Sequence, residues 1–193
     1  MHHIYHTEGI ILGSRDYGET GRYYHIFTKD LGMLYASAQG VRKMSSKLRF
    51  VLRDFSHVKV DLVQGKDFWR ITSASKTDHL EAILRNRPAL AIFANLAGLL
   101  KRLLAGAERN EGLFSDLLKG LTILEKTEKT EDLQNLEIVL VLRILHNLGY
   151  IGGEKNLDKL TRSPFESELL LEIVKSKKEA LRRINQALRE THL

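Results

Sequence analysis

Cysteine is absent from this 193-residue chain, which rules out disulfide bonds, thiolate metal sites and cysteine nucleophiles. Long apolar runs are absent as well: none approaches the roughly 18 residues that a membrane-spanning helix needs. The first six residues do not have the basic segment and apolar core of a secretory signal. We therefore expect a cytoplasmic protein with no membrane partner.

The sequence also has none of the common catalytic or cofactor-binding motifs. It contains no glycine-rich phosphate loop, no dinucleotide-binding glycine motif, no Gly-x-Ser-x-Gly and no His-Glu-x-x-His. The histidines at positions 2, 3 and 6 cluster, but neither they nor the isolated ones have the spacing of metal ligands. We therefore expect no enzymatic activity, no catalytic residues, no cofactor and no metal.

Basic residues outnumber acidic ones. The net charge is +6 and the sequence pI is about 9.5, which favours an anionic partner such as nucleic acid without requiring one. Residues 1–80 contain 12 basic and 8 acidic residues, a net charge of +4, whereas residues 81–193 contain 18 and 16. The excess of positive charge is thus concentrated in the N-terminal part.

Apolar residues alternate in the N-terminal part in the manner of β-strands. The predicted strands cover residues 4–14, 21–28, 33–41, 53–63 and 68–75. Five short antiparallel strands, with a gap between the third and fourth, are the layout of an OB-type barrel. Residues 45–52 in that gap are compatible with a short helix.

The pattern becomes helical after residue 78. Residues 90–104 are apolar nearly all round, which predicts a buried central helix. A strongly apolar helix over residues 133–148 ends before Gly149, and further helix starts are predicted at Ser163 and Ser176. The predicted fold class is therefore α+β with two domains: a five-stranded OB-type β-barrel over residues 1–78 and an all-α domain over residues 79–193.

The functional signal lies in residues 40–53, which contain five basic side chains and no acid. A basic, flexible loop beside a small barrel is a common way to hold a nucleic-acid backbone, although such a loop can also be a solvated connection. The candidate DNA-binding residues are Arg15, Arg22, Arg42, Lys43, Lys47, Arg49 and Arg53. Some of the nearby aromatic residues could stack on bases while others must line the core: Tyr17, Tyr23, Tyr24, Tyr35, Phe50, Phe68 and Trp69.

Several of these segments resemble a known family. Residues 7–22 read TEGIILGSRDYGETGR, residues 27–34 read FTKDLGML and residues 38–43 read AQGVRK. Together they are similar to the opening of the bacterial recombination mediator RecO family, in which an Asp-Tyr-Gly-Glu turn follows the first strand. The segment LRILHNLGY at residues 142–150 agrees more loosely with the helical part of that family.

The resemblance implies an OB barrel, a helical domain and a role in DNA repair and homologous recombination. Members bind single- and double-stranded DNA, anneal complementary strands, act with RecR, recognise the C-terminal tail of single-strand-binding protein and help to load RecA. The resemblance thus implies a nucleoid-associated protein. An acidic tail with an apolar end needs an apolar groove with a basic rim, for which the helical domain offers Lys101, Arg102 and Arg143.

One departure from the family concerns metal. Many members carry a four-cysteine zinc module after the Leu-Gly-Tyr motif, whereas residues 151–159 contain no cysteine here. The sequence is thus identified as a shortened, cysteine-free member, and zinc is not expected. Two other functions stay open from the residues alone: an RNA-binding OB module, and a non-catalytic adaptor whose charge is incidental.

Overall fold

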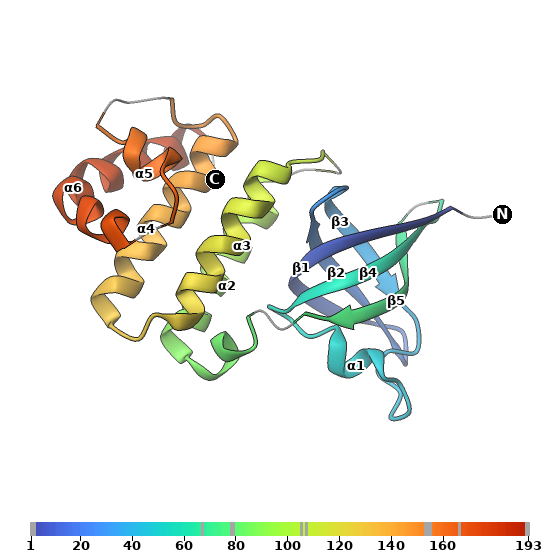
Figure 1. Cartoon of the computed structure of the whole chain (residues 1–193). Helices are drawn as coiled ribbons and strands as arrows, with labels where there is room; N and C mark the ends of the chain where they lie inside the picture. The colour runs from blue at the N-terminus through green and yellow to red at the C-terminus, as the bar shows by residue number, and fades with distance from the viewer. Residues whose placement is uncertain are drawn as a thin grey trace. The chain divides into compact units, whose positions relative to one another are not determined.

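Figure 1 shows the computed structural model of the chain, which describes residues 3–66, 68–77, 80–104, 106, 108–152, 156–165 and 167–191. The chain divides into two compact units. The first, here called the barrel unit, comprises Met1–Glu81 with Ala97–Phe114, and the second, the helical unit, comprises Ala82–Leu96 with Ser115–Leu193. The predicted boundary between residues 78 and 79 lies outside the described residues and stays a prediction.

The barrel unit is built on five strands. They are β1 (Ile4–Tyr17), β2 (Gly21–Thr28), β3 (Gly32–Ala38), β4 (His57–Gln64) and β5 (Trp69–Lys76). They close into a barrel in the order β1-β2-β3-β5-β4, and all neighbours are antiparallel except β3 and β5. The parallel pair has Ala36 in register with Trp69 and Ser37 with Arg70. A five-stranded OB-type barrel followed by helices confirms the predicted fold class.

Strand β1 is longer than predicted. It continues to Tyr17, three residues beyond the predicted end at residue 14, and the turn that follows is confined to residues 18–20. The register with β2 shifts between Ile11 and Gly13. Such a bulge bends a strand without ending it. The first half of β1 therefore pairs with β4, and the pairing of β1 with β2 continues to the last residue of β1.

Side chains alternate between the two faces of each strand, and this alternation builds the barrel core. In β2, Tyr24 and Ile26 are fully buried in the core cluster, together with Leu34 from β3 and Val60 from β4. Tyr23, which directly precedes Tyr24 in the sequence, is not part of that cluster and contacts other aromatic rings instead. The alternation therefore separates an apolar interior from an aromatic outer face.

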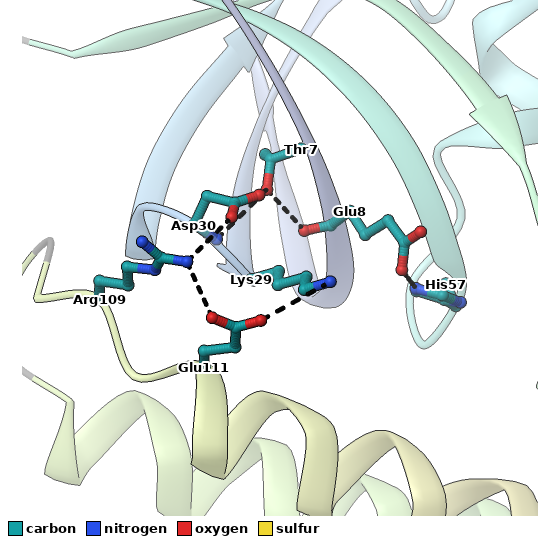
Figure 2. A network of polar contacts seen from close by, with 7 residues as sticks. All are labelled: Thr7, Glu8, Lys29, Asp30, His57, Arg109 and Glu111. Carbon is teal, nitrogen blue, oxygen red and sulfur yellow. Dashed lines mark hydrogen bonds and ion pairs between the residues drawn. The ribbon is translucent and has the colours of Figure 1, made fainter.

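A polar network joins the turn between β2 and β3 to the start of α3 (Glu111–Lys126), within the barrel unit (Figure 2). The Thr7 hydroxyl donates to the Asp30 carboxylate at 2.7 Å. The Arg109 guanidinium lies 2.8 Å from the Glu111 carboxylate and 3.7 Å from Asp30, and Lys29 lies 3.8 Å from Glu111. Because these side chains are substantially exposed, each ion pair contributes little stability. Their joint effect is to fix the turn against the first residue of the helix.

The same turn depends on a glycine. Gly32 has a φ of +69°, and a Cβ built on it would overlap the backbone of Glu108. Glycine is the residue that adopts this left-handed conformation without steric cost. The close approach of the two backbone segments therefore requires glycine at position 32.

The remaining elements are helices. They are α1 (Leu48–Val51), a 3₁₀ helix (Ala82–Arg85), α2 (Arg87–Leu103), α3, α4 (Thr130–Asn147), α5 (Asp158–Arg162) and α6 (Ser167–Glu190). Gly149 follows α4 with a φ of +79°, as expected of a residue that ends a helix. Among the described residues, no helix has the length and apolar character to cross a membrane.

Two helix predictions need correction. Helix α6 runs through Ser176 without a break, because Ile173, Ala180 and Ile184 continue one buried face and favour a single helix. Helix α2 is not buried all round, since Ala91 and Ala94 are exposed on one side. A high alanine content makes a helix look uniformly apolar in sequence even where one of its faces is accessible to solvent.

Candidate nucleic-acid interface

The loop between β3 and β4 carries most of the candidate DNA-binding residues, and it is anchored to the barrel. Val41 and Leu52 are buried in the core cluster near the two ends of the basic segment. The Arg42 backbone N–H donates to the carbonyl of Thr20 at 2.9 Å, and its guanidinium donates to the carbonyl of Gly18 at 3.3 Å. The predicted short helix is present as α1 (Leu48–Val51). The loop therefore presents its charges from a defined position.

Most cations of this loop are not neutralised. Lys43, Lys47 and Arg53 are exposed and Arg49 is half-buried. In the part of the chain that the structure describes, no carboxylate lies within ion-pair distance of these four side chains. Unpaired surface cations are free to exchange solvent counterions for phosphate groups.

Three arginines meet beside a buried tyrosine. Arg22 and Tyr24 lie two residues apart on β2, so their side chains project to the same side of the strand. Arg42 and Arg49 reach this place from the loop. The resulting pocket has a volume of about 230 Å³ and is lined by Arg22, Tyr24, Val41, Arg42, Arg49 and Leu52.

Asp16, near the end of β1, partly neutralises this cluster. Its carboxylate accepts a hydrogen bond from Arg22 Nε at 2.7 Å and lies 3.4 Å from Arg42 Nη2. The hydrogen bond from Arg22 holds the pKa of Asp16 below its ordinary value, and Asp16 in turn raises the pKa of Arg22. Asp16 and Arg22 are therefore both charged at neutral pH.

The aromatic candidates divide between the core and the surface. Tyr24 is buried and Trp69 packs against the core, whereas Tyr17, Phe50 and Phe68 are the exposed members of the set. Of these three, Phe50 belongs to α1 in the basic loop, and its exposed fraction is 59%. Phe50 is thus the exposed ring closest in sequence to the loop cations.

Arg15 lies apart from the pocket, on the outer face of the barrel. Its guanidinium carbon is 5.5 Å from the centre of the Tyr23 ring and 5.1 Å from that of Tyr35, and these two rings stack at 4.8 Å. Such cation–π contacts hold the cation over the rings. The structure therefore brings Arg22, Arg42 and Arg49 together and places Arg15 on a separate aromatic surface.

The three candidate partner-binding residues occupy different environments. Lys101 and Arg102 are exposed in the last turn of α2, and the Lys101 ammonium lies close to Gly13 on β1. Burial, followed by the charge of Lys101, lowers the pKa of His25 on β2 below its ordinary value. These two cations are accessible to a partner.

Arg143, in contrast, is buried in the helical unit, with an exposed fraction of 2%. Its guanidinium donates to the carbonyls of Leu160 and Ser163, lies 3.1 Å from Asp116, and is 4.0 Å from the centre of the Phe165 ring. Desolvation lowers its pKa although Asp116 opposes that effect. This environment argues against a place for Arg143 on the rim of an exposed groove.

The sequence analysis did not identify an apolar surface on α6. Leu171, Val174 and Leu181 are large apolar side chains that are exposed on this helix, and Lys178 is exposed beside them. Their positions at i, i+3, i+7 and i+10 place them on one face. This spacing is visible in the sequence and could have predicted the apolar face. The many charged residues of the helix instead favoured its interpretation as a solvated helix.

Within the described ranges, no three histidine, aspartate or glutamate side chains come together in a group that could hold a metal ion. The exposed His6–Asp61 contact at 2.6 Å is an isolated pair.

Comparison with known proteins bears on this barrel and its basic loop. Residues 1–79 match the family described as "Recombination protein O N terminal". The N-terminal domain of the chain, residues 1–79, thus belongs to this family. A RecO relative from Heliobacterium modesticaldum, named DNA repair protein RecO, is 31% identical over 147 residues, which are 76% of this chain and 52% of that protein. Another of the same name, from Rubrobacter xylanophilus, is 31% identical over 126 residues, covering 65% of this chain and 50% of that one.

A third RecO protein, from Alkaliphilus metalliredigens, is 29% identical over 122 residues, which are 63% of this chain and 50% of that protein. The chain thus spans about half the length of the curated RecO relatives that it matches. The family match over residues 1–79 includes the barrel strands and the basic loop.

Proposed function

We propose that this protein acts in DNA repair and homologous recombination as a RecO-type mediator. In this role it binds single- and double-stranded DNA, anneals complementary strands and helps to load the recombinase RecA onto DNA coated with single-strand-binding protein, together with RecR. The family match and the names of the relatives support the repair role. The finer activities are extended to this protein from the RecO family.

The observation that carries the proposal is the set of unpaired cations on an anchored loop. Phosphate contacts made by such cations release condensed counterions, so affinity falls linearly with the logarithm of salt concentration. Because the side chains would contact the backbone and not base edges, binding should depend little on sequence. The proposed DNA surface is centred on the five loop cations, joined by Arg22.

A salt titration tests this surface. The variant Lys43→Gln, Lys47→Gln, Arg53→Gln removes three exposed charges that have no acidic partner. On single-stranded DNA each lost phosphate contact should reduce the logarithmic salt slope by about 0.7, so the triple variant should lose a slope of about 2. Fluorescence anisotropy with an oligothymidine, at several salt concentrations, measures the slope.

The matched control removes three exposed cations from the helical unit: Lys119→Gln, Lys129→Gln and Lys178→Gln. It lowers the net charge by the same amount but should leave most of the slope unchanged. An equal loss of slope in both variants would show that net charge, and not the loop, determines binding.

A strand-annealing assay tests the mediator role. Two complementary strands are coated with single-strand-binding protein, and the rate of duplex formation is followed by fluorescence quenching. The wild type should accelerate annealing, and the loop variant should do so less. Tight binding with no acceleration would reduce the function to that of a binding module, and a clear preference for an RNA strand of the same sequence would favour the RNA-binding alternative.

The tail of single-strand-binding protein is the second proposed ligand. Lys101 and Arg102 remain the predicted contacts. The leucines beside them on α2 are buried, however, and do not offer an exposed apolar surface. The face of α6 combines exposed apolar side chains with Lys178, which matches an acidic peptide with an apolar end more closely. Binding of the tail peptide to Lys101→Glu/Arg102→Glu and to Val174→Asn/Lys178→Glu separates these two surfaces.

A further inference from the structure

The arginine pocket contains a polar group that protein atoms do not satisfy. Tyr24 lines the pocket and is fully buried, and its hydroxyl makes no hydrogen bond of normal geometry among the described residues, although the Arg22 guanidinium lies near it. Buried polar groups are nearly always paired, and an unpaired one costs free energy. Burial raises the pKa of Tyr24 to about 12, against an opposing effect of Arg22. The hydroxyl therefore stays protonated at neutral pH and can donate to a bound anion.

The charges around the pocket favour a phosphate group. Three guanidinium groups line it, and Asp16 neutralises part of their charge, which leaves a net local charge of +2. Arg49 has no carboxylate partner in the described part of the chain and donates only to the sulfur of Met44, at 2.9 Å. Thioether sulfur is a weak acceptor, so a phosphate oxygen would replace it readily. Arginine is well suited to this ligand because its planar guanidinium can bind two oxygens at once.

An exposed aromatic ring lies directly beside this pocket. The guanidinium carbon of Arg49 is 4.6 Å from the centre of the Phe50 ring, so one side chain both lines the pocket and contacts the ring. Phe50 is not committed to the core, since its exposed fraction is 59% and no residue of α1 is buried, so its ring is accessible to a ligand. Base–aromatic stacking is a main source of affinity in proteins that bind single strands.

We propose that the pocket and Phe50 together form a seat for one unpaired nucleotide, with its phosphate among Arg22, Arg42, Arg49 and the Tyr24 hydroxyl and its base stacked on Phe50. The inference rests on the proposed DNA-binding function and adds a preference to it. Bases inside a duplex are stacked on one another and cannot lie on a protein ring, whereas the loop lysines can contact the phosphates of either form. The seat would therefore favour single strands over duplex.

The test compares the affinities of Phe50 variants for an oligothymidine, for the same oligothymidine with abasic sites throughout, and for a duplex of equal length. Replacing Phe50 by Ala should weaken binding to the oligothymidine about 10-fold and leave duplex affinity within 2-fold. Phe50→Tyr should retain the wild-type affinity because it keeps the ring. Phe50→Leu, which keeps the apolar surface but not the ring, should behave as the alanine variant does. For the abasic strand, wild type and Phe50→Ala should bind alike.

A second variant tests the phosphate part of the seat. Tyr24→Phe keeps the buried ring and removes the hydroxyl, so it should fold as the wild type does and bind the oligothymidine several-fold more weakly. Circular dichroism and thermal unfolding verify the fold of each variant.

The outcomes separate the seat from the DNA-binding function. Unchanged single-strand affinity in Phe50→Ala, or an equal loss on single strand and duplex, would overturn the seat while leaving DNA binding in place. Persistence of the Phe50 effect on the abasic strand would also overturn it. Failure of the wild type to bind any of the three DNA molecules would overturn both proposals.

Discussion

Replacement of Arg143 tests whether this arginine stabilises the helical unit, as its buried position indicates, or binds a partner, as the sequence predicted. Arg143→Met keeps much of the volume of the side chain but removes its charge and its donors. Two carbonyl groups, of Leu160 and Ser163, would lose a charged donor, and Asp116 would be left as an unpaired carboxylate in a half-buried position. Breaking a buried ion pair from one side costs about 3–5 kcal/mol.

For a chain of this size, each kcal/mol shifts the unfolding midpoint by about 2–4 °C, so the variant should melt at least about 6 °C below the wild type. Far-UV circular dichroism follows the unfolding of the helices. Arg102→Met is the matched control, because it removes an exposed arginine and should change stability by less than about 0.5 kcal/mol. Asp116→Asn should cost less than Arg143→Met, since the two carbonyl groups keep their donor.

The reasoning would be refuted if Arg143→Met melted together with the Arg102→Met control. A variant of unchanged stability that had lost binding of the tail peptide would instead return Arg143 to a partner-binding surface. The expected result is lower stability with peptide binding retained below the unfolding midpoint, because Arg143 is buried and the proposed contacts of the peptide lie elsewhere.

Two further predictions concern the barrel unit. Gly32→Ala should destabilise the protein at least twice as much as Gly18→Ala in urea unfolding. Both glycines have a positive φ, but of the two only Gly32 lies against another backbone segment, that of Glu108. Gly18→Ala should cost about 1 kcal/mol, and equal costs for the two variants would mean that the contact with Glu108 is relaxed in solution. His25 has a folded-state pKa below its ordinary value of about 6.5, so the unfolded chain takes up its proton first as the pH falls, and stability decreases from about pH 6.5 down to the folded-state pKa. His25→Gln should lose less stability than the wild type between pH 7.5 and pH 5, and parallel curves would contradict this assignment.

The sequence predicts the local elements of this protein well because their signals are local. Alternation along β2 shows that Tyr23 and Tyr24 lie on opposite faces, but the face that becomes the interior depends on pairing with distant strands. Similarly, the basic segment 40–53 is visible as a run of charges, whereas its pocket needs Arg22 and Tyr24 from a strand that is about 20 residues away. Contacts of this kind follow from topology and cannot be read from a pattern in one segment.

Arg143 shows the same limit in the helical unit. In the segment LRILHNLGY it interrupts an apolar helix and is indistinguishable from a surface cation. Its partners Asp116, Leu160 and Ser163 lie 17–27 residues away along the chain. Only the packing of α3, α4 and α5 shows that the charge is enclosed, and a single helix gives no signal of this.

The parallel contact between β3 and β5 has a consequence for how the barrel moves. This seam is short, with Ala36 opposite Trp69 and Ser37 opposite Arg70, whereas the antiparallel neighbours are in register along most of their lengths. Local opening costs least where the fewest backbone hydrogen bonds must break together. Amide protons along the seam should therefore exchange with solvent faster than those between β1 and β4. The barrel is closed in its average structure, but we expect it to open locally between β3 and β5.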